Sequence, residues 1–339
     1  RRFGPQTQGL RLGFMQNTNL LEIKNLRTYF YVRGFVAKAV DNVSLTIKSG
    51  ETLGLVGESG CGKSVTAHSI IRLIPDPPWK IESGEILFDD KELLELSEYQ
   101  MRKIRGNRIS MIFQEPMTSL NPVFPVGDQV AEVIRLHQKL SRSVTRERVI
   151  DMFQLVGIPA AEKRLSDYPH QMSGGMRQRV MIAMALACNP KLMIADEPTT
   201  ALDVTIQAQI LDLMNKLKNE TGASILFITH DLGVIAEMAQ NVAVMYAGKI
   251  MEYTDVKTIY ANPKNPYTIG LLQSIPVLGR ETKEDRLKTI SGVVPSLLNL
   301  PAGCLYNDRC PDVFSDCHQV EPEMYPVAKN HFVRCLKYA

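Results

Sequence analysis

The stretch GESGCGKS, from Gly57 to Ser64, has the residue types and the spacing of a phosphate-binding loop. It matches the pattern G-x-x-x-x-G-K-S in full. Glycines at these positions let backbone N–H groups turn inward around a phosphate chain, and the positive end of a following helix favours the same anion. Lys63 is expected to reach the β- and γ-phosphates, and the Ser64 hydroxyl is expected to bind Mg²⁺. The expected contacts to a nucleotide are Gly57, Glu58, Ser59, Gly60, Cys61, Gly62, Lys63, Ser64 and Val65.

A pair of carboxylates ends the apolar run KLMIADEP, from Lys191 to Pro198. Asp196 is a suitable partner for Mg²⁺, and Glu197 is a suitable group to polarise an attacking water. Such a pair alone is more often a solvated turn or a helix cap. Because a phosphate loop stands in the same chain, the pair instead favours hydrolysis of a nucleoside triphosphate.

The stretch MSGGM, from Met172 to Met176, places Ser173, Gly174 and Gly175 before a long predicted helix. This is a second helix N-terminus suited to phosphate, and one nucleotide does not need two such ends from one subunit. Here the chain resembles the ATP-binding subunits of ABC transporters, in which this signature closes over the nucleotide held by a partner subunit. The usual form in that family is LSGGQ, whose first and last positions are methionine in this chain.

The resemblance implies roles for further residues, which occur in the expected order. Gln114 in IFQEP matches the loop that senses nucleotide and contacts the membrane subunit. The resemblance also makes Gln114 a ligand of Mg²⁺. Asp203 in TTALD matches the loop that crosses to the partner's site, and His230 in ITHD matches the histidine beside the γ-phosphate. Phe30 in NLRTYF matches the aromatic residue that stacks on adenine, with its neighbours Tyr29 and Tyr31 as the alternatives. The implied catalytic set is Glu197, His230 and Gln114.

The elements that must position these residues follow an α/β pattern. Strands are predicted at 21–32, 39–48, 52–57, 84–90, 109–114, 191–197, 224–230 and 241–253. Helices are predicted after the phosphate loop, at 64–74, and after the acidic strand, at 204–220. From about Pro125 to Pro169 the periodicity is helical throughout. After about Ala261 prolines crowd together and periodicity fades, which predicts a separate, loop-rich tail.

The resemblance implies an ABC-type nucleotide-binding domain, with a RecA-like α/β core, an antiparallel β subdomain and an all-helical insert. We expect this domain over residues 21–260, with the insert at about 120–185, and a C-terminal extension over 261–339. The segment before Met15 lacks the apolar core of a signal peptide and is interpreted as a remnant of cloning, with the natural chain starting at Met15. Residues 1–20 are therefore assigned to this remnant and a short leader.

The sequence of the tail resembles one particular group of ABC transporter ATPases. The stretches NPYTIGLLQSIP, SGVVPSLLNLPAGC and RCPDVFSDC resemble the C-terminal extension of ATPases in dipeptide, oligopeptide and nickel importers. This implies an ATP-hydrolysing subunit of an importer for dipeptides or oligopeptides, with nickel or another solute as the alternative. The implied partners are a second ATPase subunit, a paralogue in a head-to-tail dimer, two transmembrane permease subunits and, indirectly, an extracytoplasmic solute-binding protein. The implied location is the cytoplasmic face of the cell membrane, as a peripheral subunit.

Other functional classes fit less well. A net charge of +3 on 339 residues shows no nucleic-acid footprint, and no apolar run approaches the roughly 18 residues of a membrane span. Repair and chromosome ATPases carry long coiled coils after the phosphate loop, and no sustained heptads occur here. Tandem ABC proteins of the ribosome need two phosphate loops, and this chain has one. A redox-sensing iron–sulfur scaffold that binds ATP would rest on the tail cysteines alone.

Four of the six cysteines gather in the tail, at Cys304, Cys310, Cys317 and Cys335. Without an export signal the expected compartment is a reducing cytosol, which disfavours disulfides. A proline-rich segment without a core of its own needs a staple, which predicts a bound metal centre. Structural zinc usually shows closely spaced cysteine pairs, and none occurs here, so a [4Fe–4S] cluster is favoured. Zn²⁺ stays the alternative, because His318 and His331 allow a mixed site.

Overall fold

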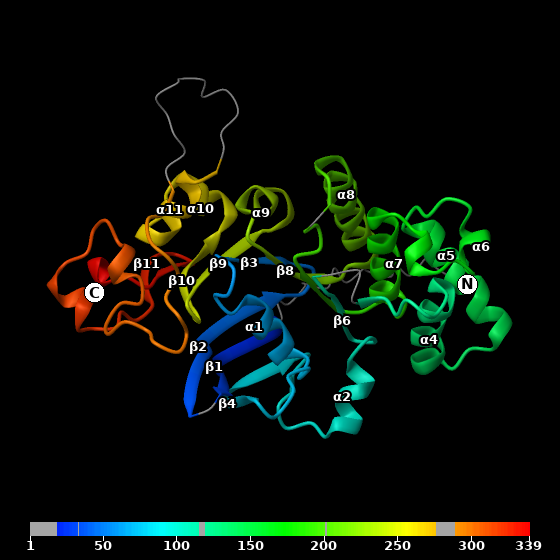
Figure 1. The fold of residues 1–339 in the computed structure, drawn as a ribbon, viewed down its shortest axis with the longest axis horizontal. Coiled ribbons are helices and arrows are strands. Elements are labelled where there is room, and N and C mark those ends of the chain that lie inside the picture. Colours follow the sequence, from blue (N-terminus) through cyan, green and yellow to red (C-terminus); the bar gives the residue numbers. More distant parts are fainter. Residues whose placement is uncertain (1–18, 33, 115–118, 201, 276–288) are drawn as a thin grey trace, which may run out of the picture.

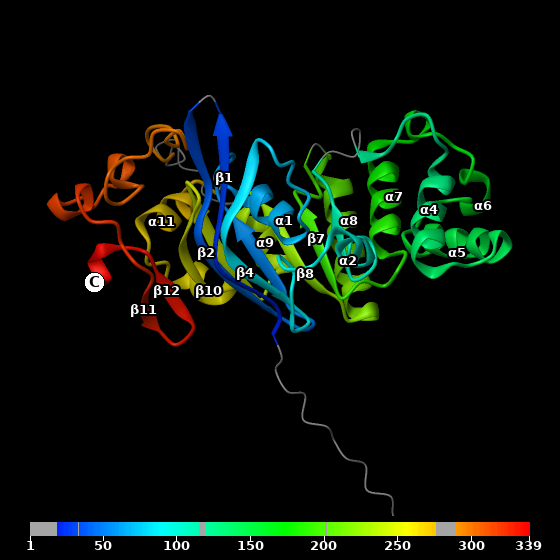
Figure 2. The same ribbon diagram turned by 90° about the horizontal axis from the view of Figure 1, so that it is seen from below.

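The computed structural model describes residues 19–32, 34–114, 119–200, 202–275 and 289–339. The predicted leader, residues 1–20, lies almost entirely outside this part of the chain. Figure 1 shows an elongated molecule with two sheets at its centre, the helices between β6 and β7 at one end and the C-terminal tail at the other. The view in Figure 2 has the same order along the long axis.

The larger sheet holds the elements on which the phosphate loop and the acidic pair stand. Its strand order is β11-β12-β10-β9-β3-β8-β7-β6, and the neighbouring strands from β9 to β6 are parallel. The central strands are fully buried runs of apolar residues, as expected for a parallel sheet that is covered on both faces. Their bounds are β3 Thr52–Val56, β6 Ile109–Ile112, β7 Leu192–Asp196, β8 Ser224–Thr229, β9 Asn241–Tyr246 and β10 Lys249–Asp255.

Alternate side chains of this sheet enter two different cores, because successive residues of a strand point to opposite faces. In β8, Ile225 and Phe227 join the core shared with the helices of the insert, whereas Leu226 and Ile228 join the core beneath the smaller sheet. The sheet is therefore covered on both faces. Helices α8 (Val204–Thr221) and α9 (Leu232–Met238) supply buried residues to the first core, and α1 (Lys63–Ile70) supplies them to the second.

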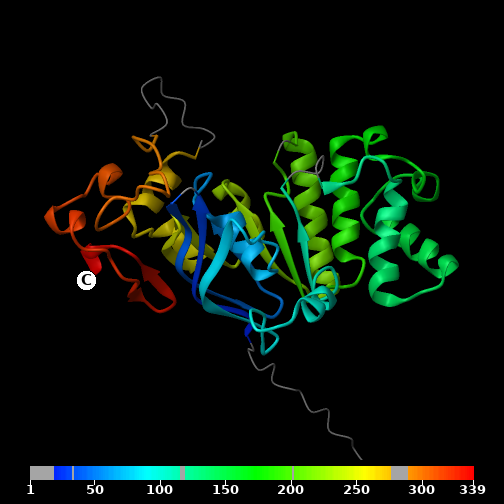
Figure 3. The ribbon, with the colours of Figure 1, turned by 60° about the horizontal axis from the view of Figure 1, so that its bottom comes forward.

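The smaller sheet is antiparallel, with the order β2-β1-β4-β5. It is built from β1 (Asn19–Val32), β2 (Phe35–Lys48), β4 (Trp79–Phe88) and β5 (Lys91–Glu92), and α2 (Glu98–Ile104) follows it. In Figure 3 its blue and cyan strands occupy the centre, between the tail and the insert.

Only helices occur between β6 and β7 among the residues described there. They are α4 (Val126–Gln138), α5 (Arg142–Leu155), α6 (Ala161–Arg164), the short η1 (Pro169–Gln171) and α7 (Gly174–Leu186). Throughout the described ranges, no helix is long and apolar enough to cross a membrane.

The tail is loop-rich, but it is not separate from the sheet. After α10 (Val256–Ala261) and α11 (Pro266–Gln273), its last strands, β11 (Tyr325–Ala328) and β12 (His331–Val333), form a hairpin in which β12 pairs with β10. Buried polar groups fix this hairpin. His331 Nε2 lies 2.7 Å from Glu252 Oε1, and Arg334 Nε donates to the carbonyl oxygen of Ile250. The C-terminal end of the tail is thus joined to the larger sheet through β12.

Candidate active site

The phosphate-binding loop joins the central strand β3 to helix α1, as its motif requires. Two of its glycines are fixed by close packing and by left-handed backbone. A Cβ atom on Gly57, whose φ is 155°, would lie 2.1 Å from the carbonyl oxygen of Met245. One on Gly62, whose φ is 109°, would lie 2.1 Å from that of Ala39. Only glycine fits these positions, which hold the loop between the two sheets.

Lys63 begins α1 and folds back over the loop. Its side chain is buried, and Nζ donates to the carbonyl oxygens of Gly57 at 2.7 Å and Glu58 at 3.1 Å. The ammonium group is thus held against the loop that would surround the phosphates.

Asp196 ends β7 and is 2% exposed. Burial raises the pKa of this carboxyl to about 6, a hydrogen bond from Ser64 lowers it, and the charge of Glu197 raises it. Among the described residues, its Oδ1 atom has no hydrogen-bond partner. A buried carboxylate oxygen needs a donor or a cation. Ser64 and Asp196 therefore form a pair of oxygen ligands that fits Mg²⁺.

Glu197 is the point on which three strand ends converge. Its Oε2 accepts a hydrogen bond from Gln114 Nε2 at 3.1 Å and lies 3.3 Å from Nδ1 of His230. Thr200 Oγ1 donates to the same oxygen at 2.9 Å. Gln114 follows β6, Glu197 follows β7, and His230 follows β8, which are neighbours in the parallel sheet. Glu197 also has φ of 46°, a conformation that is costly without Gly and that collects at functional sites.

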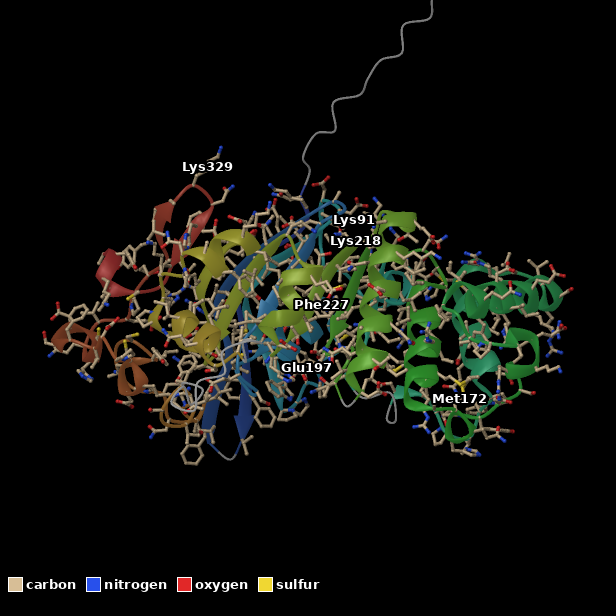
Figure 4. All side chains as sticks on the ribbon, turned by 90° about the horizontal axis from the view of Figure 1, so that it is seen from above. Lys91, Met172, Glu197, Lys218, Phe227 and Lys329 are labelled. Atoms are coloured by element: carbon tan, nitrogen blue, oxygen red, sulfur yellow. The ribbon has the colours of Figure 1, made fainter. Side chains whose placement is uncertain are left out.

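The signature lies on another part of the molecule. Ser173 caps the 13-residue helix α7, where its Oγ accepts from the Met176 amide at 3.3 Å. Met172 is buried in the core, and in Figure 4 its label stands well apart from that of Glu197. The signature packs against the segment that holds Asp203, since a Cβ atom on Gly175 would lie 2.8 Å from Ile206 Cγ2. The structure thus does not bring Ser173 to Glu197 of its own chain.

Asp203 is the cap of the following helix. Its Oδ1 accepts from the amide of Ile206 at 2.9 Å, which fixes the start of α8. The next residue, Val204, is 84% exposed, although it is apolar.

Phe30 lies on β1 of the antiparallel sheet and is half-buried. Its ring packs on that of Trp79, with 4.4 Å between the centroids. The hydroxyls of its two neighbours are already engaged, since Tyr29 donates to Asp41 and Tyr31 to Glu82. The sequence pattern did not single out Trp79, although it is the only tryptophan of the chain.

The four tail cysteines line one small cavity of about 20 Å³, and all are free thiols. Burial raises the pKa of Cys304 to about 11, and the three other thiols contribute further in the same direction. The donor types suit a metal centre. The thiols are not arranged as metal ligands in this structure, however, because within the described ranges no group of three or more His, Cys, Asp or Glu could hold a metal ion. The [4Fe–4S] cluster therefore stays a prediction.

Comparison with known proteins places these features in a family. Residues 40–200 match the model described as ABC transporter, and residues 251–317 match that described as oligopeptide/dipeptide transporter, C-terminal region. A probable peptide ABC transporter ATP-binding protein of Sinorhizobium fredii is 53% identical over 318 residues, which cover 94% of this chain and 95% of that protein. The chain belongs to the ABC transporter ATP-binding family.

Other members of the family agree over the same length. The oligopeptide transport protein AppD and the dipeptide transport protein DppD of Bacillus subtilis are each 50% identical, over 95% and 93% of this chain and 97% and 94% of their own. Among solved structures, a dimeric ATP-binding cassette bound to ADP and Pi has a TM-score of 0.63 at 29% identity. It covers 70% of this chain and 98% of its own length. The cassette cbiO1 of Clostridium perfringens has a TM-score of 0.61 at 28% identity, covering 72% and 91%.

Family membership and the α/β cassette fold, both predicted from the sequence, are thus confirmed. The chain is an ABC-type ATPase. One residue of the candidate site was not predicted from the sequence: Thr200, whose hydroxyl donates to the carboxylate of Glu197. The adjacent threonines in DEPTT were the only signal for it in the sequence.

Proposed function

We propose that this ATPase powers a membrane importer for dipeptides or oligopeptides. The observation that carries the catalytic part is the convergence of Gln114 and His230 on Glu197 Oε2. The peptide part is supported by the match of residues 251–317 and by the peptide-import names of relatives that are about half identical over nearly the whole chain. Nickel or another solute is the alternative cargo. Uptake of labelled peptide by the reconstituted transporter tests the assignment.

In this proposal Glu197 is the base. The hydrogen bonds that Gln114 and Thr200 donate to Oε2 hold the Glu197 carboxylate in place, so that its other oxygen can accept a proton from water attacking the γ-phosphate. Lys63 binds the β- and γ-phosphates, and Ser64 and Asp196, with Gln114, hold Mg²⁺. When bound, the ion neutralises charge that develops on the phosphates. His230 contacts the γ-phosphate, and Phe30 stacks on adenine.

A second cassette completes the site in a head-to-tail dimer. This is supported by the separation of Met172, the first residue of the signature, from Glu197 in Figure 4, and by the exposure of the following Ser173 and Gly174. The apolar Val204, which is 84% exposed beside Asp203, supports it too. The similar cassette bound to ADP and Pi is itself a dimer. We propose that the partner is a paralogue. Copurification from the native host would identify it, and a partner identical to this chain would refute the heterodimer.

Gln114 and the helical insert provide the docking surface for a membrane permease, one of the two permease subunits of the transporter. A cavity of about 1,140 Å³ opens between α4 and α5, lined by Phe124, Glu132, Arg135 and Arg146 among others. Phe124 and its neighbour Val123 are 54% and 70% exposed. An exposed apolar pair beside a charged groove suits a protein partner. In this arrangement the chain sits on the cytoplasmic face of the membrane and meets the extracytoplasmic solute-binding protein only through the permeases.

The tail cysteines bind a [4Fe–4S] cluster that fixes the extension. This is supported by four free thiols around one cavity in a segment that has few apolar core residues. Protein prepared without oxygen should be brown and contain about four iron atoms per chain. A colourless preparation with one zinc ion per chain would refute the cluster in favour of Zn²⁺.

A further inference from the structure

The C-terminal extension forms hydrogen bonds with both the side chain and the backbone of one residue of the phosphate loop, Glu58. Arg309 Nη1 and Nη2 donate to the two carboxylate oxygens of Glu58 at 2.8 and 3.0 Å. The backbone amide of Glu58 donates to the hydroxyl of Tyr267 at 3.0 Å. Both partners belong to the extension, and Arg309 is 251 residues away along the chain. This is therefore a long-range contact between the extension and the nucleotide loop.

The Arg309 side chain is built into a buried setting. It is 5% exposed, and its guanidinium carbon lies 5.7 and 5.9 Å from the ring centroids of Tyr246 and Tyr306. These rings also pack on Tyr267, at centroid distances of 4.6 and 5.3 Å. A planar guanidinium that forms two parallel hydrogen bonds and lies against aromatic rings has one preferred geometry. Lysine cannot reproduce it.

Glu58 links Arg309 to the residues of the loop that are expected to contact phosphate. It directly follows Gly57, whose backbone is fixed against Met245, and its own carbonyl oxygen accepts from Lys63 Nζ. Holding its amide and its carboxylate therefore fixes the first turn of the loop and one acceptor of Lys63. The ion pair itself is expected to be worth little to folding, because burying it costs solvation. The pair is expected to affect nucleotide binding because it fixes the position of the phosphate loop.

Arg309 emerges from a turn between two of the tail cysteines. In this turn, which ends in η2 (Asn307–Arg309), the Asn307 amide donates to the carbonyl oxygen of Cys304 at 3.0 Å, and Cys310 directly follows Arg309. The cysteine cavity and the phosphate loop are thus parts of one connected structure.

We propose that Arg309 is a positioning residue for nucleotide binding: through Glu58, the C-terminal extension sets the affinity of the phosphate loop for ATP. The inference rests on the proposed function, since it takes the loop to be the ATP site. It adds a residue outside the cassette motifs to the machinery that binds nucleotide.

The test measures the Kd of a fluorescent ATP analogue, with Mg²⁺, for the purified full chain and its variants. Arg309→Met removes both hydrogen bonds and should weaken binding roughly tenfold, within the usual range of coupling between two sites. Glu58→Gln should weaken it similarly, and the double variant should be no weaker than either single variant, because both changes break one interaction. Arg309→Lys should not restore the wild-type Kd. Hydrogen exchange at residues 57–64 should rise in the Arg309 variants.

Arg334→Met is the matched control for the stability of the extension. Arg334 is equally buried, and its side chain donates to the carbonyl oxygens of Ile250 and Pro322. This change should lower the melting temperature but leave the Kd unchanged. If it weakens binding as much as Arg309→Met does, the effect is one of general stability and the proposal is wrong.

A wild-type Kd in Arg309→Met would also overturn the proposal. Should that variant not fold, Glu58→Gln decides, since its side chain is partly exposed and a wild-type Kd in this second variant would equally overturn the proposal. Failure of the unaltered chain to bind the analogue would instead refute the proposed function.

Discussion

Gln114 Nε2 donates a hydrogen bond to Glu197 Oε2 at 3.1 Å, although the two residues are 83 positions apart in the chain, with most of the intervening residues in the insert. The contact exists because β6 and β7 are parallel neighbours, so that their carboxyl ends meet at one edge of the sheet. It joins Glu197, the proposed catalytic base, to the start of the segment that leads into the insert. A change at the nucleotide can therefore reach the surface proposed to bind the permease.

Replacing Glu197 with Gln should keep ATP binding and nearly stop turnover. The amide keeps the shape of the side chain but cannot accept a proton, and loss of general-base catalysis typically costs about 10²- to 10⁴-fold in rate. Turnover and the Kd for ATP are measured on the same preparation. Thr200→Val, which removes one hydrogen bond to the same oxygen, serves as the milder companion. Near-normal turnover in Glu197→Gln would remove this residue from the catalytic role.

Mg²⁺-dependent turnover should fall as the pH drops through about 6. Burial raises the pKa of Asp196 to about 6, so that below this pH the folded protein holds a neutral carboxyl that binds Mg²⁺ poorly. A pH–rate profile at limiting Mg²⁺, where the metal does not outcompete the proton for Asp196, checks this, with parallel measurement of folding by circular dichroism. A profile that is flat from pH 7 to 5 would contradict the assignment of Asp196 to the metal.

The same raised pKa predicts the effect of Asp196→Asn on stability. When the pKa of a carboxyl is higher in the folded than in the unfolded state, the protein loses stability as the pH rises from the unfolded-state pKa to the folded-state pKa. The loss persists at all higher pH values. Without Mg²⁺ or nucleotide, Asp196→Asn should therefore increase the free energy of unfolding at pH 7.5 by up to about 3 kcal/mol. The gain should vanish below about pH 4, where both states are protonated. Denaturant titrations at the two pH values measure it, and an equal effect at both would exclude this cause.

Substituting Phe124 with Ser should uncouple transport while sparing ATP binding. This side chain lines the groove of the insert and is 54% exposed, so its removal should leave the fold intact. Loss of an aromatic anchor from an interface costs about 2 kcal/mol, so the affinity for the permease should fall by roughly 30-fold. Tyr99→Ser, at a 70% exposed aromatic on α2, is the control outside the insert. Equal transport in the two variants would place the docking surface elsewhere.

Replacing Cys304, Cys310, Cys317 and Cys335 together with Ser should abolish bound iron and lower the melting temperature. Four thiolates are the ligand set that a cubane cluster needs, and the extension would lose its staple. Cys188→Ser is the control, since Cys188 is also a free thiol but lies outside the tail. Iron and acid-labile sulfide are assayed in protein made without oxygen. Full retention of iron in the fourfold variant would show that the metal is bound elsewhere.

The cassette could be predicted from the sequence because its signals are local. The phosphate loop, from Gly57 to Ser64, is contiguous and stands between a strand and a helix. The meeting of Glu197 with Gln114 and His230 follows from the rule that parallel strands end at one edge. The tail hairpin has no such signal, since β11 and β12 have four and three residues, too few for alternation to be recognised. Nor has the pair of Glu58 and Arg309, because one arginine in a turn gives no clue to a carboxylate 251 residues away.

Peptide uptake by the complete transporter tests the central claim most directly. Vesicles would contain this chain with its copurified ATPase and permease partners and be loaded with ATP and Mg²⁺. The binding protein and a labelled dipeptide or oligopeptide are then supplied outside. We predict uptake that requires internal ATP and is lost in a complex carrying Glu197→Gln. Vesicles that accumulate labelled nickel but no peptide, or that take up peptide equally well with Glu197→Gln, would contradict the account.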